Sequence, residues 1–203
     1  MPPSSAPAPR KRLVIASANA GKLAEFRALL ADLPFDLTSL GEMALPSPEE
    51  TGSTFLANAT LKARHAARAT GLAAIADDSG LEVDALGGAP GVFSARYAGA
   101  QGDDAANNLK LVQALKGRPR QERRARYRCV LALVRDPFDP DPLIAEGIWE
   151  GEILDTPRGS GGFGYDAYFF LPELGVSAAE LPAHEKNRLS HRGRAMRALR
   201  DRL

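Results

Sequence analysis

The feature that most constrains the fold of this chain is its opening, where a strand pattern runs through a small polar turn into a helix pattern. The apolar run at 13–16 is typical of a buried strand. In the segment 22–30 after the turn, Leu23, Phe26 and Leu30 recur at helical spacing, which gives this helix one apolar face. Such an opening is typical of chains that pack helices against a sheet.

The rest of the chain alternates in the same way. Strands are predicted over residues 35–40, 73–76, 81–85, 126–134 and 143–149, and helices over 54–70, 103–115 and a basic segment from about 186. We expect Leu109, Val112 and Leu115 to face inward from the helix 103–115. Helices mixed with strands, with no internal repeat, indicate an α/β or α+β fold.

Composition excludes several classes of protein. The 203 residues include 26 Lys+Arg and 25 Asp+Glu, and this balance argues against a nucleic-acid coat or a polybasic membrane binder. No apolar run approaches the roughly 18 residues that a membrane span needs, so we expect a soluble protein. Cys129 lies in an apolar run and is expected to be a buried structural thiol. Residues 1–12, rich in Pro, Ser and Ala, are expected to be a disordered tail, with the folded domain over 13–203.

The turn after the first strand is a candidate phosphate cradle. A helix that begins there presents backbone N–H groups and the positive end of its dipole, and a lysine adds a full charge. The residues are Ser17, Ala18, Asn19, Ala20, Gly21 and Lys22. This is not a Walker A loop, because Ala16 stands where its first glycine would be and Leu23 replaces the Ser or Thr that binds magnesium. An ordinary turn with a surface lysine is the alternative.

A polar stripe lies on the predicted helix 54–70. Thr54, Asn58 and Lys62 are four residues apart and therefore share one face, which His65 extends. The stripe is either a solvated face or one side of a site that contains other charged groups. We expect His65 to be structural or at the surface.

An acidic segment, Asp77-Asp78-Ser79-Gly80, is predicted as a turn after an apolar strand. Two adjacent carboxylates repel each other unless a cation or hydrogen-bond donors compensate. Neighbouring strand residues point to opposite sides, so one carboxylate is expected to face a site while the other anchors the backbone. Glu49 or Glu50 could add an oxygen ligand, and oxygen ligands without a Cys or His cluster suit Mg²⁺. A polar turn capped by Asp is the alternative.

The glycine-rich stretch 159–164 and the basic C-terminal segment make a fourth candidate group. Phe163 and Tyr165 flank a glycine, so an aromatic ring can stand exposed at a loop tip, where stacking on a base contributes ~1–3 kcal/mol. Lys186, His191 and Arg192 are donors that suit a keto oxygen or a phosphate, unless they form a solvated basic face.

Together these groups indicate an enzyme that acts on nucleotides, because they provide a phosphate cradle, a carboxylate-bound metal, an aromatic platform and polar donors. No Ser/His/Asp or Cys/His nucleophile arrangement is present in the sequence pattern. Metal-assisted attack by water is therefore the favoured chemistry.

The same segments resemble a known family, the noncanonical purine nucleoside triphosphate pyrophosphatases, also called inosine triphosphate or dITP/XTP pyrophosphatases. The resemblance runs from about Leu13 to Leu199, with the motifs in the same order. The matching segments are 17–22 followed by Glu25, 50–55 with Asn58-Ala59 and Lys62-Ala63, 76–84, 88–97, 161–166 and 190–192.

The resemblance implies an α/β fold, elongated and two-lobed, around a long mixed β-sheet flanked by helices, with the substrate in the cleft between the lobes. It implies Mg²⁺-dependent hydrolysis of ITP, dITP and XTP to the monophosphate and pyrophosphate, which cleanses the nucleotide pool. It further implies a cytoplasmic homodimer that binds neither nucleic acid nor a membrane.

The resemblance also implies roles for single residues. Asp78 would be the proton acceptor and a metal ligand, helped by Glu50 rather than Glu49. Residues 17–22 and Lys62 would hold the triphosphate, and Ser79 would touch the substrate. Base binding would fall to Phe163, Gly164, Tyr165 and Asp166, with Lys186, His191 and Arg192 completing recognition.

Two residues depart from the family pattern, and three other functions stay open. Ala57 stands where the family usually has Glu, so one carboxylate near the metal is missing, and Ala167 replaces a usual proline. The first rival is a pyrophosphatase that acts on modified pyrimidine or methylated triphosphates. The second is a nucleotide-binding regulator without turnover, and the third is nucleic-acid binding through residues 118–128 and the C-terminal arginines.

Overall fold

Seven strands form one mixed sheet in the computed structural model, which describes residues 10–203, with the strand order β2-β1-β3-β4-β5-β6-β7. Strand β1 (Lys11–Ile15) pairs in parallel with β2 (Phe35–Ser39) and β3 (Ala73–Val83). The remaining pairs are antiparallel and add β4 (Arg124–Val134), β5 (Leu143–Ile153), β6 (Phe169–Leu171) and β7 (Val176–Ser177).

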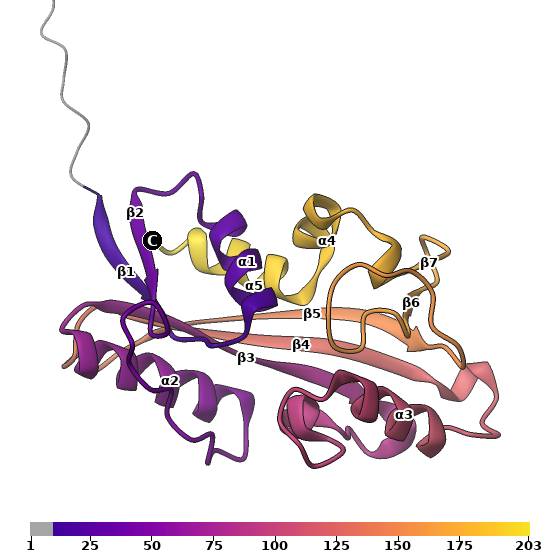
Figure 1. Cartoon of the computed structure of the whole chain (residues 1–203). Coiled ribbons are helices and arrows are strands. Elements are labelled where there is room, and N and C mark those ends of the chain that lie inside the picture. The colour runs from indigo at the N-terminus through magenta and orange to yellow at the C-terminus, as the bar shows by residue number, and fades with distance from the viewer. Residues whose placement is uncertain (1–9) are drawn as a thin grey trace, which may run out of the picture.

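Helices cover both faces of this sheet (Figure 1). One face carries α1 (Ala20–Leu29), α4 (Ala183–Leu189) and α5 (His191–Arg200), and the other carries α2 (Phe55–Thr70) and α3 (Asp104–Ala114). Short 3₁₀ turns span Asp84–Leu86, Gly91–Arg96, Arg120–Glu122 and Ala178–Glu180, and the second of these is called η2 below. The predicted α/β fold, a long mixed sheet flanked by helices, is confirmed.

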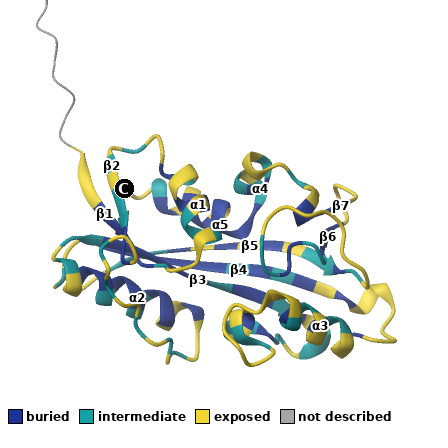
Figure 2. Ribbon diagram, viewed as in Figure 1, coloured by how far each residue is buried: buried dark blue, intermediate teal, exposed yellow. Residues whose placement is uncertain are grey.

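The period of two along each strand divides the core between the two faces. Val14 packs into the cluster under α2, whereas its neighbours Leu13 and Ile15 pack into the cluster under α1 and α5. A third cluster around Trp149 and Phe169 fills the opposite end of the sheet. Figure 2 shows the buried strands between the two exposed helical surfaces. Cys129 is fully buried, as predicted.

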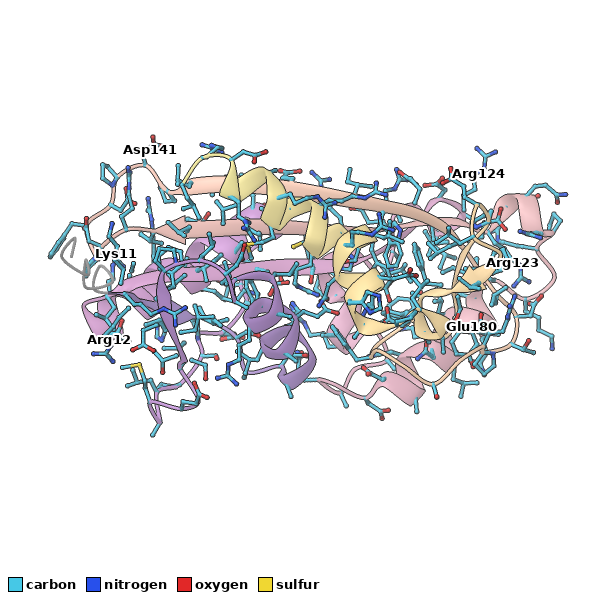
Figure 3. The ribbon with its side chains drawn as sticks, turned by 90° about the horizontal axis from the view of Figure 1, so that it is seen from above. Lys11, Arg12, Arg123, Arg124, Asp141 and Glu180 are labelled. Atoms are coloured by element: carbon cyan, nitrogen blue, oxygen red, sulfur yellow. The ribbon has the colours of Figure 1, made fainter. Side chains whose placement is uncertain are left out.

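The molecule is long in the direction of the strands. Seen from above, Lys11 and Asp141 lie at one end of the sheet and Arg124 and Glu180 lie at the other (Figure 3). No helix within residues 10–203 is long and apolar enough to cross a membrane.

The first and third strands differ from the sequence expectation. Strand β1 begins at Lys11, two residues before the predicted start, because it pairs with β2 from that residue on. The rest of the predicted tail, residues 1–9, lies outside the described residues. The predicted turn at 77–80 is wrong: β3 is one strand, because β4 pairs with it from Ala74 to Val83.

Two helix predictions also need correction. In α3, Leu109 is 59% exposed and Leu111 is buried in its place, because the helix turns a different face to the sheet. Val112 is half-buried, and Leu115, just after the helix, is buried as predicted. The single basic helix predicted from about 186 is two helices. Ser190 separates them, and its hydroxyl caps α5 by accepting a hydrogen bond from the Gly193 N–H at 3.2 Å.

Candidate active site

The candidate site opens where β1 ends beside the longer β3. Strand β1 pairs with β3 only as far as Ile75, and beyond that point β3 has β4 on one side and the η2 region on the other. Side chains from both faces of β3 can therefore reach the space between α1 and η2. Ligands of open α/β sheets commonly bind at such places, at the carboxyl end of a parallel strand.

Two cavities lie there, one of about 480 Å³ and one of about 80 Å³, and both are lined by Asn19, Lys22, Ser79 and Ala95. Because they share these residues, they lie side by side, and the two together are called the cleft below. Predicted site residues that line the larger cavity are Ser17, Ala18, Asn19, Lys22, Glu50, Lys62, Asp78 and Ser79. Those that line the smaller cavity are Phe163, Gly164, Tyr165, Asp166, Lys186, His191 and Arg192.

Two residues of the predicted cradle line neither cavity. Ala20 is exposed at the start of α1. Gly21 lies under the Phe163 ring, so closely that a Cβ added to it would be 2.5 Å from Phe163 Cδ1. The absence of a side chain at Gly21 therefore allows the Phe163 ring to pack closely against the start of α1.

Strand alternation sends the two neighbouring carboxylates of β3 to opposite faces, as the sequence predicted. Asp78 points to the α2 side, where Lys62 Nζ lies 3.0 Å from its Oδ1. Asp77 points to the side of α1 and α5, where Lys22 Nζ and Arg192 Nη2 lie 3.1 and 2.8 Å from its Oδ2. The cations compensate the repulsion between the two carboxylates.

The Asp78 side is a chain of alternating charges. Lys62 Nζ donates to Glu50 Oε1 at 2.7 Å as well as to Asp78, and Arg96 Nη1 donates to Glu50 Oε2 at 3.1 Å. Burial raises the pKa of Asp78, and the charges of Lys62 and Lys22 offset only part of that effect. A carboxylate with a raised pKa is a better proton acceptor.

Asp77 has a different role from the one predicted. Its Oδ2 binds the side chains of Lys22, Arg192 and Ser79, so it anchors cations and not the backbone. Burial alone would raise the pKa of its carboxyl, but the charges of Lys22 and Arg192 outweigh burial and hold that pKa well below its ordinary value. Asp77 is therefore held ionised.

Glu25 is a buried residue of this site to which the sequence reading gave no role. It accepts from Lys186 Nζ at 2.8 Å and from Arg192 Nη1, and Lys186 Nζ also donates to Asp166 Oδ2 at 2.6 Å. Its position one helical turn after Lys22 could have indicated that Glu25 faces the site, because residues three apart share a helix face. Arg96 was missed as well.

The aromatic residues lie deeper than predicted. Tyr165 is buried and its hydroxyl donates to the Ser94 carbonyl at 2.7 Å, because the chain turns inward after Gly164. Phe163 is half-buried, with Lys186 Nζ 4.6 Å from its ring centroid. Neither ring stands free at a loop tip.

His191 stacks on Tyr127, with the two ring centroids 4.6 Å apart. Burial, together with the charge of Arg192, lowers the pKa of His191 well below its ordinary value, so the ring is neutral. Within residues 10–203, neither His191 Nδ1 nor Arg192 Nε has a hydrogen-bond partner, although both atoms are buried. Both residues line the smaller cavity, so a ligand there lies against the side chains that carry these atoms.

The polar stripe on α2 divides between the helix cap and the site. Thr54 caps the helix by accepting from the Ala57 N–H at 3.1 Å, while Asn58 and Lys62 face Asp78. His65 lies outside the cleft, with Nε2 2.9 Å from the Pro46 carbonyl oxygen.

The donor set near Asp78 fits a hard divalent cation. Within the described part of the chain no group of three or more His, Cys, Asp or Glu side chains is arranged for a metal. Asp78 and Glu50, however, already share one cation, the Lys62 ammonium. Mg²⁺ typically takes one or two carboxylates and keeps several waters, so these two residues are a sufficient protein contribution. Ala57 is exposed and lines neither cavity.

Fold and site together define a class of protein, an open α/β sheet with a two-part cleft. The larger cavity, lined by lysines and carboxylates, can hold an anion, and the smaller cavity, lined by aromatic residues, can hold a flat ring beside it. Comparison with known proteins narrows this class. The chain belongs to the Ham1 family, whose sequence pattern matches residues 13–202. The predicted family is thereby confirmed.

Relatives and solved structures agree with this assignment. A protein of Xanthomonas campestris pv. campestris (strain 8004), named dITP/XTP pyrophosphatase, is 56% identical over 193 residues, which cover 95% of this chain and 97% of the relative. A protein of the same name from Methylococcus capsulatus is 56% identical over 194 residues, 96% of each chain. The structure of a HAM1 protein from Coxiella burnetii is similar with a TM-score of 0.85 and 51% identity, over 93% of this chain and 96% of that one.

Proposed function

We propose that this protein hydrolyses noncanonical purine nucleoside triphosphates, namely ITP, dITP and XTP, to the nucleoside monophosphate and pyrophosphate. The observation that carries the proposal is that the two cavities lie side by side, with Lys22 and Ser79 lining both. This arrangement allows one molecule that spans both cavities to place a charged tail beside Lys62 and a ring beside Phe163.

The enzyme class follows from the relatives. Proteins more than 50% identical over nearly the whole chain are named dITP/XTP pyrophosphatase, so the chain is a nucleoside triphosphate hydrolase. The choice of scissile bond and the metal requirement belong to the proposal.

In the proposed reaction, water attacks a phosphorus in line and pyrophosphate leaves. Lys22 and Lys62 neutralise charge on the polyphosphate, and Asp78 orients the water and accepts its proton. The raised pKa of Asp78 supports this assignment, because a proton acceptor works best when its pKa is closer to the working pH. Glu50 accepts a second hydrogen bond from Lys62 Nζ, so the ammonium group is held between Glu50 and Asp78.

Mg²⁺ is the proposed cofactor, with Asp78 and Glu50 as its protein ligands. When bound, it would supply further charge neutralisation on the phosphate oxygens. The two carboxylates hold the Lys62 ammonium between them, which supports a cation site at this position.

Base selection is proposed to depend on the buried donors of the smaller cavity. ITP and XTP bases carry a keto oxygen at position 6, which can accept a hydrogen bond from the His191 or Arg192 side chain. Both residues line the smaller cavity. Adenine presents an amino group instead, and an unpaired buried donor costs ~1–3 kcal/mol. This difference favours ITP over ATP.

We also propose a homodimer that works in the cytoplasm without nucleic-acid or membrane partners. A groove of about 640 Å³ supports a second copy as the partner, because the exposed side chains of Leu56 and Phe93 line it. Light scattering coupled to size exclusion gives the oligomeric state directly.

The test of the function is a nucleotide panel with pyrophosphate detection, with and without Mg²⁺. ITP, dITP and XTP are expected to be hydrolysed far faster than ATP, and only with the metal. Asp78→Asn is expected to keep the fold and abolish turnover. Preference for modified pyrimidine or methylated triphosphates would refute the substrate class, Mg²⁺-dependent ITP binding without hydrolysis would refute the reaction, and near-normal pyrophosphate release by Asp78→Asn would refute its role.

A further inference from the structure

Asn58 is a fully buried side chain that bridges the two carboxylate-bearing segments of the cleft. It is 0% exposed, and its Nδ2 donates to Asp78 Oδ2 at 3.1 Å. Its Oδ1 accepts from the Gly52 N–H at 2.7 Å. Because the amide is held at both ends, its orientation is fixed, and its donor is directed at the Asp78 carboxylate.

The two oxygens of Asp78 are therefore held from two positions one helical turn apart on α2. Lys62 holds Oδ1 and Asn58 holds Oδ2, which fixes the plane of the carboxylate. The Lys62 contact is ionic and competes with the phosphates of the proposed substrate. The Asn58 contact is neutral and buried, so it stays in place when Lys62 turns to a ligand.

Gly52 completes this arrangement, and its lack of a side chain has a specific reason. A Cβ on Gly52 would lie 2.5 Å from Asn58 Oδ1, closer than real Cβ contacts allow. Its backbone is not in the left-handed region, so the close approach to Asn58 Oδ1, and to Ala57 Cβ at 2.9 Å, is the reason for glycine here. Gly52 is also two residues from Glu50, so the same hydrogen bond ties the Glu50 segment to Asp78.

We infer that Gly52 and Asn58 form a positioning relay, in which the Gly52 N–H orients the Asn58 amide and the amide orients the Asp78 carboxylate for attack by water. This inference rests on the proposed function, in which Asp78 accepts the proton. Loss of a group that orients a metal-ligating carboxylate, as Asp78 is in the proposed function, typically costs about 10–100-fold in metal affinity or activity. The relay acts on the chemical step and leaves nucleotide binding to the rest of the cleft.

Two variants test the relay, each with a matched control. Asn58→Ala removes the amide, and Asn107→Ala is its control because Asn107 is an equally buried asparagine that bonds only to backbone groups at Ala95 and Ala98. Gly52→Ala keeps the amide and displaces it, and Gly41→Ala is its control because a Cβ there would meet nothing within 4 Å.

Steady-state kinetics with ITP and urea unfolding are measured on all four variants. Asn58→Ala and Gly52→Ala are expected to lower kcat about 10–100-fold with KM changed by less than about threefold. Asn107→Ala is expected to lose stability but keep kcat, and Gly41→Ala to keep both. Unchanged kcat in Asn58→Ala or Gly52→Ala, or an equal fall in Asn107→Ala, would overturn the relay.

A measurement without turnover separates the relay from the proposed function. In nitrogen-15 spectra, the Asn58 side-chain NH₂ signal, assigned by its loss in Asn58→Ala, is expected to shift and exchange faster in Asp78→Ala and Gly52→Ala but not in Gly41→Ala. If the protein hydrolyses none of the nucleotides, the proposed function fails while this signal still decides whether the relay exists. An Asn58 signal that is the same in all these variants rules the relay out.

Discussion

Replacing Arg192 with methionine should reveal how strongly the charges under the cleft stabilise the fold. The Arg192 and Asp77 side chains are 1% and 0% exposed, and Arg192 also donates to Glu25. Removing one partner of a buried ion pair leaves an uncompensated charge and typically costs about 3–5 kcal/mol. We expect the lower end, because Asp77 keeps Lys22 at 3.1 Å and Glu25 keeps Lys186 at 2.8 Å.

A loss of about 3 kcal/mol in a chain of this length corresponds to a fall of about 6–12 °C in Tm, at roughly 2–4 °C for each kcal/mol. Urea unfolding at pH 7.5, repeated at low and high salt, gives the free energy directly. Because the Arg192 pair is excluded from solvent, its contribution should change little with salt.

The matched control is Arg200→Met. Arg200 forms a two-pronged ion pair with Asp32, at 2.9 and 2.6 Å, but this pair is accessible to water, with the two side chains 33% and 66% exposed. Salt screens such exposed pairs, and the variant should leave the unfolding midpoint almost unchanged. If Arg192→Met and Arg200→Met reduced stability equally, burial would not be the source of the effect and the reasoning would fail.

The remaining predictions concern the aromatic chamber. Phe163→Ala should raise KM for ITP far more than His65→Ala, because base stacking contributes ~1–3 kcal/mol; equal KM values would remove the stacking argument. The folded-state pKa of His191 lies well below 6.5, so below pH 6.5 unfolding takes up a proton that the folded protein excludes. The free energy of unfolding therefore decreases as pH falls, by up to ~1.4 kcal/mol per pH unit. His191→Phe should flatten this slope in urea titrations from pH 7 to 5. An unchanged slope in the variant would contradict the assignment to His191. Asp104 accepts a hydrogen bond from the Gly164 N–H at 2.8 Å, and Asn108 donates one to the Gly164 carbonyl at 2.9 Å. Asn108→Ala should therefore loosen the loop that carries Phe163 and raise KM for ITP at constant kcat. An unaltered KM would show that this loop keeps its position without Asn108.

Features of the cleft that depend on local spacing could be predicted from the sequence. The period of two puts Asp77 and Asp78 on opposite faces, and the period of 3.6 puts Asn58 and Lys62 on one face. Both patterns need only a few consecutive residues.

Features that depend on distant partners could not be predicted in this way. Arg192 meets Glu25 across 167 positions, and Arg96 meets Glu50 across 46, and no local pattern encodes either contact. The predicted turn at 77–80 failed for the same reason. Polar residues beside a glycine resemble a turn, but pairing with β4 keeps this segment extended.

The charge balance of the cleft gives the proposed metal a physical reason that is independent of family resemblance. Lys62 and Arg96 compensate the charges of Asp78 and Glu50, and Lys22 and Arg192 compensate that of Asp77. A polyphosphate that draws both lysines toward itself leaves these carboxylates buried with less compensation, which is costly in a desolvated site. A divalent cation held by Asp78 and Glu50 would restore the balance, because its charge would compensate both carboxylates. On the proposed function, Lys22 and Lys62 would hold the polyphosphate while Asp78 and Glu50 would hold the metal, so each ligand would strengthen the binding of the other.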